Sequence, residues 1–221
     1  MVKLVSVHLP KTAGTSFGDS IAAAYNQDVR LDYADRPINQ PRDVRLKQAE
    51  MHNKATPGIS EQAIHGHFLP AKYAYLSEQR SVRFVTWLRE PVSRLKSHYC
   101  FWRDTPAPAE VPPLRKRMLE EKWTFLEFAT EPALQNMYQQ FFEGFDMKRF
   151  DFIGITERYE QDLLACASLL RVTLEVSQKN TARQAPGLQI SDVELNTICD
   201  FHQGDIKLYC DIVERRMTRM K

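Results

Sequence analysis

The chain has 221 residues, of which 43% are apolar and 26% are charged; this composition supplies a globular core and excludes a mainly disordered chain, and the length favours one domain over residues 1–221. Thirty Lys and Arg residues against 28 Asp and Glu residues leave a net charge of +2. This balance excludes proteins that coat nucleic acid or anionic membranes, so we expect no nucleic-acid partner and expect any anionic ligand to be bound by a local cluster of groups.

A strand, a tight loop and a helix are predicted in this order twice in the first half of the chain. Residues 3–8 form a short β-branched run, and residues 15–25 hold helix formers behind a glycine and a hydroxyl residue. Residues 82–87 are the second strand candidate, and Pro91 stands where the following helix would place its first residue.

The second half of the chain repeats this alternation. Residues 150–155 are predicted as a strand, followed by Thr156 as the N-cap of a helix through Leu170, and residues 172–176 are a candidate fourth strand. Strands that alternate with helices predict an α/β fold with a central parallel β-sheet flanked by helices.

Helices are also predicted in the remaining apolar segments. Residues 123–145 read as one or two helices broken near Pro132, and a C-terminal helix carries an apolar stripe. The residues of this stripe are Ile206, Tyr209, Cys210, Val213 and Met217. Residues 28–58 and 104–113 are polar or rich in proline, and we expect them to be loops over the ligand site.

The cysteine spacing and the hydropathy pattern indicate in which cellular compartment the protein resides. Cys100, Cys166, Cys199 and Cys210 match no spacing of a zinc or redox site, so we expect them to be small core residues in a reducing environment. The longest nearly uninterrupted apolar run is the eight residues 163–170, whereas a membrane span needs about 20. We therefore expect a cytoplasmic protein with no membrane span.

The first segment that carries chemistry is residues 7–17, V-H-L-P-K-T-A-G-T-S-F, where a strand passes through a small-residue loop into a helix. Unpaired N–H groups and the helix dipole make such a helix N-terminus an anion pocket, to which Lys11 adds a full charge. A Walker A loop has two glycines and places its lysine after them, whereas here Lys11 precedes Gly14. The alternative is an ordinary turn with a surface lysine.

The second segment is residues 89–99, R-E-P-V-S-R-L-K-S-H-Y, also after a strand. Arg89 offers a rigid fork to phosphate oxygens, and Ser97 offers a hydroxyl donor near the end of the second helical turn. The two side chains would share one phosphate only if it lay along the flank of the helix. The alternative is a solvated basic helix face.

Together the two segments resemble sulfotransferases that use 3′-phosphoadenosine-5′-phosphosulfate (PAPS), in particular the branch of the heparan sulfate and uronyl 2-O-sulfotransferases. Residues 10–17 are similar to the family's 5′-phosphosulfate loop, and residues 89–99 to its 3′-phosphate motif R-x-P-x-x-R-x-x-S-x-Y. Weaker resemblance covers residues 64–68, 135–137, 154–160 and 179–183. The resemblance implies a P-loop-like sulfotransferase fold.

The resemblance also implies which residues bind the nucleotide. Lys11 and the loop residues Thr12, Ala13, Gly14, Thr15 and Ser16 would hold the 5′-phosphosulfate and stabilise charge on the departing phosphate oxygen. Arg89 and Ser97 would hold the 3′-phosphate, and Thr181 and Arg183 would close over the nucleotide. The product would be 3′-phosphoadenosine 5′-phosphate (PAP), and no metal is expected because positioning and charge stabilisation carry the transfer.

A base must take the proton of the acceptor. His65-Gly66-His67 resembles the H-G-H segment of the 2-O-sulfotransferase branch, which implies that His67 is the base. A buried structural histidine, a metal pair of His65 with His67, and Glu90 as the base are the alternatives.

Three functions follow from these residues. The first is transfer of a sulfuryl group from PAPS to a hydroxyl, and we expect the acceptor to be a carbohydrate. The second is a nucleotide kinase or NTPase on a related fold, for which the Walker A loop is missing. The third is a non-catalytic protein that binds nucleotides or anionic glycans.

Overall fold

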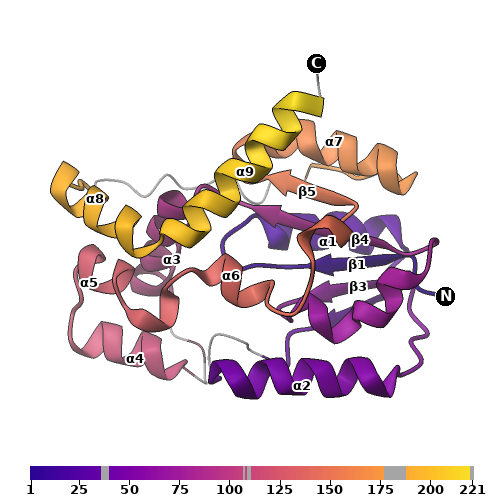
Figure 1. Ribbon diagram of the computed structural model, residues 1–221, viewed down its shortest axis with the longest axis horizontal. Coiled ribbons are helices and arrows are strands. Elements are labelled where there is room, and N and C mark those ends of the chain that lie inside the picture. Colours follow the sequence, from indigo (N-terminus) through magenta and orange to yellow (C-terminus); the bar gives the residue numbers. More distant parts are fainter. Residues whose placement is uncertain (36–39, 107, 109–110, 177–187, 220–221) are drawn as a thin grey trace. The chain divides into compact units, whose positions relative to one another are not determined.

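A five-stranded parallel sheet organises the computed structural model, which describes residues 1–35, 40–106, 108, 111–176 and 188–219. Its strands are β1 (Leu4–Val7), β2 (Val29–Asp32), β3 (Ala63–Gly66), β4 (Arg83–Leu88) and β5 (Phe152–Ile155). They lie in the order β2-β3-β1-β4-β5, and every neighbouring pair is parallel. The predicted α/β class with a central parallel sheet flanked by helices is therefore confirmed (Figure 1).

Helices connect the strands and follow the last of them. They are α1 (Gly14–Ala24), α2 (Arg42–Ala55), α3 (Pro91–Asp104), α4 (Pro113–Glu120), α5 (Phe125–Ala129), α6 (Met137–Phe141), α7 (Tyr159–Leu170), α8 (Asp192–Phe201) and α9 (Gln203–Arg219). Shorter 3₁₀ segments occupy Pro70–Glu78, Pro132–Leu134, Met147–Arg149 and Thr156–Arg158. Within the described residues, no helix is long and apolar enough to cross a membrane.

The chain divides into two compact units. Unit 1 comprises Met1–Leu88 and Gln140–Ala182 and contains the sheet, and unit 2 comprises Arg89–Gln139 and Arg183–Lys221. Helices α1, α2 and α7 belong to unit 1, whereas α3, α4, α5, α8 and α9 belong to unit 2. A single domain over residues 1–221 stays a prediction.

Helices α1 and α7 pack on one face of the sheet in unit 1. Phe17 and Ile21 of α1 and Leu163 and Cys166 of α7 share one buried cluster with Val85 of β4. Cys166 is thus the small core residue that the sequence predicted. The same expectation is wrong for Cys210, which is exposed, and for Cys100 and Cys199, which are half-buried, because these positions face outward on their helices.

Several predicted elements differ in the structure. Residues 28–58 are not a loop, because they contain β2 and α2. Helix α2 could not be recognised from the sequence, because its buried residues, Arg45 and Ala49, make no apolar stripe. Residues 172–176 form no strand, since the hydroxyl of Ser20 donates to the carbonyl of Glu175 and holds this segment against α1 instead.

The predicted start of α7 is wrong, whereas two predictions for other helices agree with the structure. Thr156 does not cap α7, because it lies in the preceding 3₁₀ segment and its hydroxyl donates to the carbonyl of Leu88 at 2.9 Å. The predicted C-terminal helix is present as α9, where Ile206, Tyr209 and Val213 of the apolar stripe are half-buried beside the buried Asp205 and Ile212, and Cys210 is exposed. The break of residues 123–145 near Pro132 is confirmed by α5, a 3₁₀ turn and α6.

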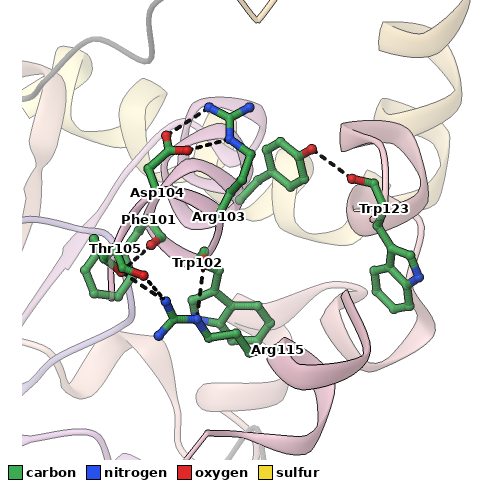
Figure 2. Close-up of polar contacts among 8 residues, drawn as sticks. Phe101, Trp102, Arg103, Asp104, Thr105, Arg115 and Trp123 are labelled. Carbon is green, nitrogen blue, oxygen red and sulfur yellow. Dashed lines mark hydrogen bonds and ion pairs between the residues drawn. The ribbon is translucent and has the colours of Figure 1, made fainter. Parts of the chain in front are cut away.

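A buried arginine closes the C-terminal end of α3 in unit 2 (Figure 2). Nε of Arg115 donates to the carbonyl of Trp102 at 3.1 Å, and Nη2 donates to the carbonyl of Thr105 at 2.6 Å. These carbonyls belong to the end of a helix, where they have no partner within the helix itself. Arg115 therefore links α4 to α3 and satisfies polar groups that burial would otherwise leave unpaired.

We expect Arg115→Met to lower the free energy of unfolding by about 2–4 kcal/mol, because it leaves the buried carbonyl of Trp102 and the partly buried carbonyl of Thr105 without donors. Arg117→Met in the same helix is the matched control. Arg117 pairs with Glu131 at the surface, and loss of such a pair should cost no more than about 1 kcal/mol. Urea unfolding of both variants measures the difference, and equal losses would contradict the capping role of Arg115.

Candidate functional site

The loop between β1 and α1 is strained. Lys11 has φ 69° and Ala13 has φ 63°, so two non-glycine residues of this short loop adopt the left-handed conformation. Such residues cost on the order of 1–3 kcal/mol each and cluster at ligand sites. Ala13 directly precedes the first residue of α1, Gly14. The predicted sequence of strand, tight loop and helix is present here.

The loop presents backbone groups more than side chains. Thr12 is fully buried and its hydroxyl donates to the carbonyl of Leu9 at 2.9 Å, which fixes the turn. The N-terminus of α1 carries the positive end of the helix dipole and directs N–H groups of its first turn outward, from Gly14 and Thr15 onward. Lys11 is half-buried at the same turn. The loop therefore has the parts of an anion site.

Three histidines and a tyrosine pack together beside this loop. The ring centroids of His8 and His67 are 4.2 Å apart, and those of His8 and His65 are 5.1 Å apart in a stacked arrangement. The ring of Tyr33 stands edge-on to His67 at 4.9 Å. Among the described residues, no group of three His, Cys, Asp or Glu side chains is arranged to hold a metal ion.

Gly14 is required for this packing. A Cβ atom on Gly14 would lie 1.8 Å from the His8 ring, which is far inside van der Waals contact. The absence of a side chain at the first residue of α1 therefore lets the imidazole of His8 lie against the start of the helix. Through His8 the histidine cluster contacts the loop directly.

His67 has the proton arrangement of a general base. Its Nδ1 lies 2.5 Å from the carbonyl oxygen of His8, and because a carbonyl only accepts, Nδ1 carries the proton. The lone pair of the neutral ring is then on Nε2, which makes no hydrogen bond to any residue that the structure describes. Burial lowers the pKa of His67, and the hydrogen bond to His8 opposes this shift.

His8 and His65 are more deeply buried and remain neutral. Burial lowers the pKa of His65 to about 4, and His67 nearby contributes. Burial, followed by the charges of His67, His65 and Lys11, lowers the pKa of His8 well below its usual value. Nδ1 of His65 shares a hydrogen bond with the Ser6 hydroxyl at 2.8 Å. His65 is thus a deeply buried histidine held by Ser6.

Tyr33 was missed by the sequence analysis because it follows an unrecognised strand. Its hydroxyl shares a hydrogen bond of 3.0 Å with Nδ1 of His8, and burial raises its pKa to about 12, so the phenol stays protonated. A buried ion pair fixes the loop that carries it, since Nζ of Lys72 lies 2.7 Å from Asp32 and 2.8 Å from Asp35. No motif marks this tyrosine; only the strand order brings it to the histidines.

The second predicted segment begins α3 in unit 2. Pro91 is the first helical residue, as predicted, and Glu90 is its N-cap. The carboxylate of Glu90 accepts from the N–H groups of Val92 at 2.9 Å and Ser93 at 2.7 Å. Both carboxylate oxygens are engaged in capping, which favours the structural interpretation of Glu90 over a role as base.

The side chains of Arg89 and Ser97 are half-buried, and neither makes a hydrogen bond or ion pair to a residue that the structure describes. Pro91 and Ser97 are separated by about 9 Å along the helix axis. The backbone of Arg89 is held on both sides, because the hydroxyl of Tyr138 accepts from its N–H and donates to its carbonyl. Arg89 therefore projects from a fixed backbone.

Tyr138 is itself fixed by residues that the sequence analysis did not find. The carboxylate of Asp205 on α9 accepts from the N–H of Tyr138 at 3.0 Å, and the Arg94 guanidinium lies 5.7 Å from the centre of its ring. Burial raises the pKa of Asp205 to about 6, and the charge of Arg94 opposes this shift. These partners come from distant segments, so no spacing in the sequence could reveal them. Thr181 and Arg183 lie outside the described residues.

Comparisons with known proteins find structures but no sequence family. No protein-family model matches the chain, and no curated protein matches it significantly. A sulfotransferase from Alicyclobacillus acidocaldarius has 12% sequence identity and a TM-score of 0.49, with 94% of this chain and 93% of that chain covered. Mouse sulfotransferase SULT7A1, complexed with PAP, has 12% identity and a TM-score of 0.39, with 90% of this chain covered.

This chain spans 62% of the length of the mouse protein. An uncharacterized protein from Eubacterium ventriosum has 10% identity and a TM-score of 0.39, with 76% of this chain and 98% of that chain covered. Two of the three similar structures are thus named sulfotransferases. At TM-scores below 0.5 these likenesses decide neither fold nor activity, and the fold assignment stands on the strand order of the sheet itself.

We expect Gly14→Ala to lower the free energy of unfolding by about 1–3 kcal/mol, because the new methyl group collides with the His8 ring in a packed site. Gly58→Ala is the matched control, since a Cβ at Gly58 meets nothing within 4 Å, and its effect should stay within about 0.5 kcal/mol. Urea unfolding measures both. Equal stabilities would show that His8 does not pack on α1 as described.

Proposed function

We propose that this protein is a PAPS-dependent sulfotransferase, which moves a sulfuryl group to an acceptor hydroxyl with His67 as the base. The carrying observation is the contact chain within unit 1: His67 hydrogen-bonds to His8, and His8 packs on Gly14 at the start of α1. His8 thereby connects the proposed proton acceptor, His67, to the N-terminus of α1, where the anion would bind. The resemblance of residues 10–17 and 65–67 to the 2-O-sulfotransferase branch supports the same assignment.

In the proposed reaction, Nε2 of His67 takes the proton as the acceptor oxygen bonds to sulfur. The bond between sulfur and the 5′-phosphate oxygen breaks in line, and PAP leaves with the electron pair. Lys11 and the backbone N–H groups of residues 12–16 stabilise the charge that develops on the leaving oxygen, which is the role of preorganised donors in a transition state. This proposal assigns positioning and charge stabilisation to protein groups, with no metal ion required.

The 3′-phosphate is assigned to Arg89 and Ser97 in unit 2. The guanidinium of Arg89 offers two parallel N–H donors to phosphate oxygens, and the Ser97 hydroxyl adds a neutral donor. Tyr138 supports the assignment because it fixes the backbone of Arg89. By resemblance, Thr181 and Arg183 are proposed to close over the nucleotide.

The proposed acceptor is a carbohydrate. The H-G-H resemblance supports a sugar hydroxyl as the acceptor, and the ring of Tyr33, which is 37% exposed, lies beside the ring of His67. An aromatic side chain next to the base offers an apolar face to the C–H groups of a sugar. The proposed compartment is the cytoplasm.

PAP should stabilise the protein against thermal unfolding far more than ADP does, because only PAP carries a 3′-phosphate for Arg89 and Ser97. At a PAP concentration of about 100 times its Kd, the expected gain is roughly 2.7 kcal/mol. Arg89→Ala should remove the preference, whereas Arg103→Ala in the same helix should keep it, since Arg103 pairs with Asp104 at the surface. Equal stabilisation by PAP and ADP in the parent chain would contradict the assignment of PAPS as the sulfuryl donor.

His67→Asn should lower the rate of sulfuryl transfer by about a hundredfold or more, because it removes Nε2, while the Asn amide still donates to the His8 carbonyl. PAP affinity should stay near that of the parent chain. Since burial lowers the pKa of His67, the rate of the parent should fall only below pH 6.5, as the base becomes protonated. A well-folded His67→Asn protein with normal turnover would place the base elsewhere.

A further inference from the structure

A groove of about 770 Å³ lies in unit 1 at the edge of the sheet where the strands begin. Lys3 precedes β1, Arg83 is the first residue of β4, and both line the groove. The C-terminal ends of α1 and α7 form its other walls, with Asn26 and Arg171 just beyond the helices. The groove is therefore built from elements of unit 1 alone.

This groove is separate from the loop between β1 and α1. The loop follows the carboxyl end of β1, whereas the groove adjoins its amino end. The four residues of β1 separate the two by about 13 Å of extended chain. A ligand in the groove would contact neither His67 nor Lys11.

The lining of the groove is positively charged. Lys3, Arg80, Arg83 and Arg171 line it, and none of the Asp and Glu residues in the described part of the chain does. Arg83 is partly neutralised by Asp151 at 2.7 Å, and Lys3 donates to the amide oxygen of Gln62 at 2.6 Å. Arg80 and Arg171 make no ion pair with any residue that the structure describes.

Stabilisation of a helix C-terminus accounts for the position of only one of these cations. Arg171 caps the C-terminus of α7, where a cation is favourable. The same residue has φ 56°, a conformation that glycine or asparagine adopts at lower cost. Arg80 and Lys3 lie in loops that precede strands and cap no helix. Three separate segments of chain thus bring cations to one concave surface.

We propose that this groove binds a ligand with clustered tetrahedral oxyanions, that is, several phosphate or sulfate groups on one small molecule. Each free guanidinium offers a planar fork that matches two oxygens of such a group, and the hydroxyls of Ser81 and Ser168 add neutral donors. The volume is much larger than one phosphate, and the cations lie around it, so several anionic groups are matched at once.

Titration calorimetry of the full chain with tripolyphosphate and with sucrose octasulfate tests this inference. We expect saturable binding that weakens by about tenfold or more in Arg80→Ala/Arg171→Ala, because two charged donors are lost. Lys47→Ala/Lys54→Ala removes the same net charge from exposed positions of α2 and should bind as the parent does. A preference for one probe shows whether phosphate or sulfate esters are the natural class.

Amide chemical shifts locate the binding. Shifts at Asn26, Ser81 and Ser168 support the groove, and shifts confined to Gly14 and Thr15 would place the probe at the loop and overturn the inference. No saturable binding of either probe, or equal weakening in the two double variants, would overturn it as well. The outcome is independent of PAP binding and of His67, so it separates this inference from the proposed transfer reaction.

Discussion

One extension of the β-ladder fixes the candidate site of unit 1. Beyond the last paired residues of β1 and β3, the N–H of His8 donates to the carbonyl of Gly66 at 2.9 Å, and Nδ1 of His67 donates to the carbonyl of His8 at 2.5 Å. The first bond carries the strand pairing one residue further. The second sets the tautomer of His67. Both use the backbone of His8, so the orientation of the His67 ring and the exit of the loop toward α1 have one common origin.

This arrangement needs backbone to approach closely at two glycines. A Cβ on Gly66 would lie 1.8 Å from the carbonyl oxygen of Asp32, and one on Gly14 would meet the His8 ring. The stacked imidazoles are compatible with each other because burial holds their pKa values below 6.5, so they do not repel as cations near neutral pH. The buried pair of Lys72 with Asp32 then anchors the loop that carries Tyr33 over them.

The sequence predicted the elements whose pattern is local and missed those that depend on partners. The strands β1, β4 and β5 and the helix that starts at Pro91 follow from β-branched runs and proline placement. Strand β2 and helix α2 carry no such pattern, since Leu31 is 67% exposed and α2 buries an arginine. Tyr138 and Asp205 became visible only because the fold joins residues 67 positions apart.

The cap that Asp205 places on α6 ties this short helix to α9. Helix α6 has only five residues and would not be stable alone in water. Its first-turn N–H groups donate to the carboxylate of Asp205 on α9. While the protein is being synthesised, the loop after β1 acquires its sheet neighbours early. Tyr138, and with it the backbone of Arg89, acquires its final support only when α9 emerges. The backbone support of Arg89, just before α3, therefore forms only after α9 has been synthesised, and a chain without α9 would lack it.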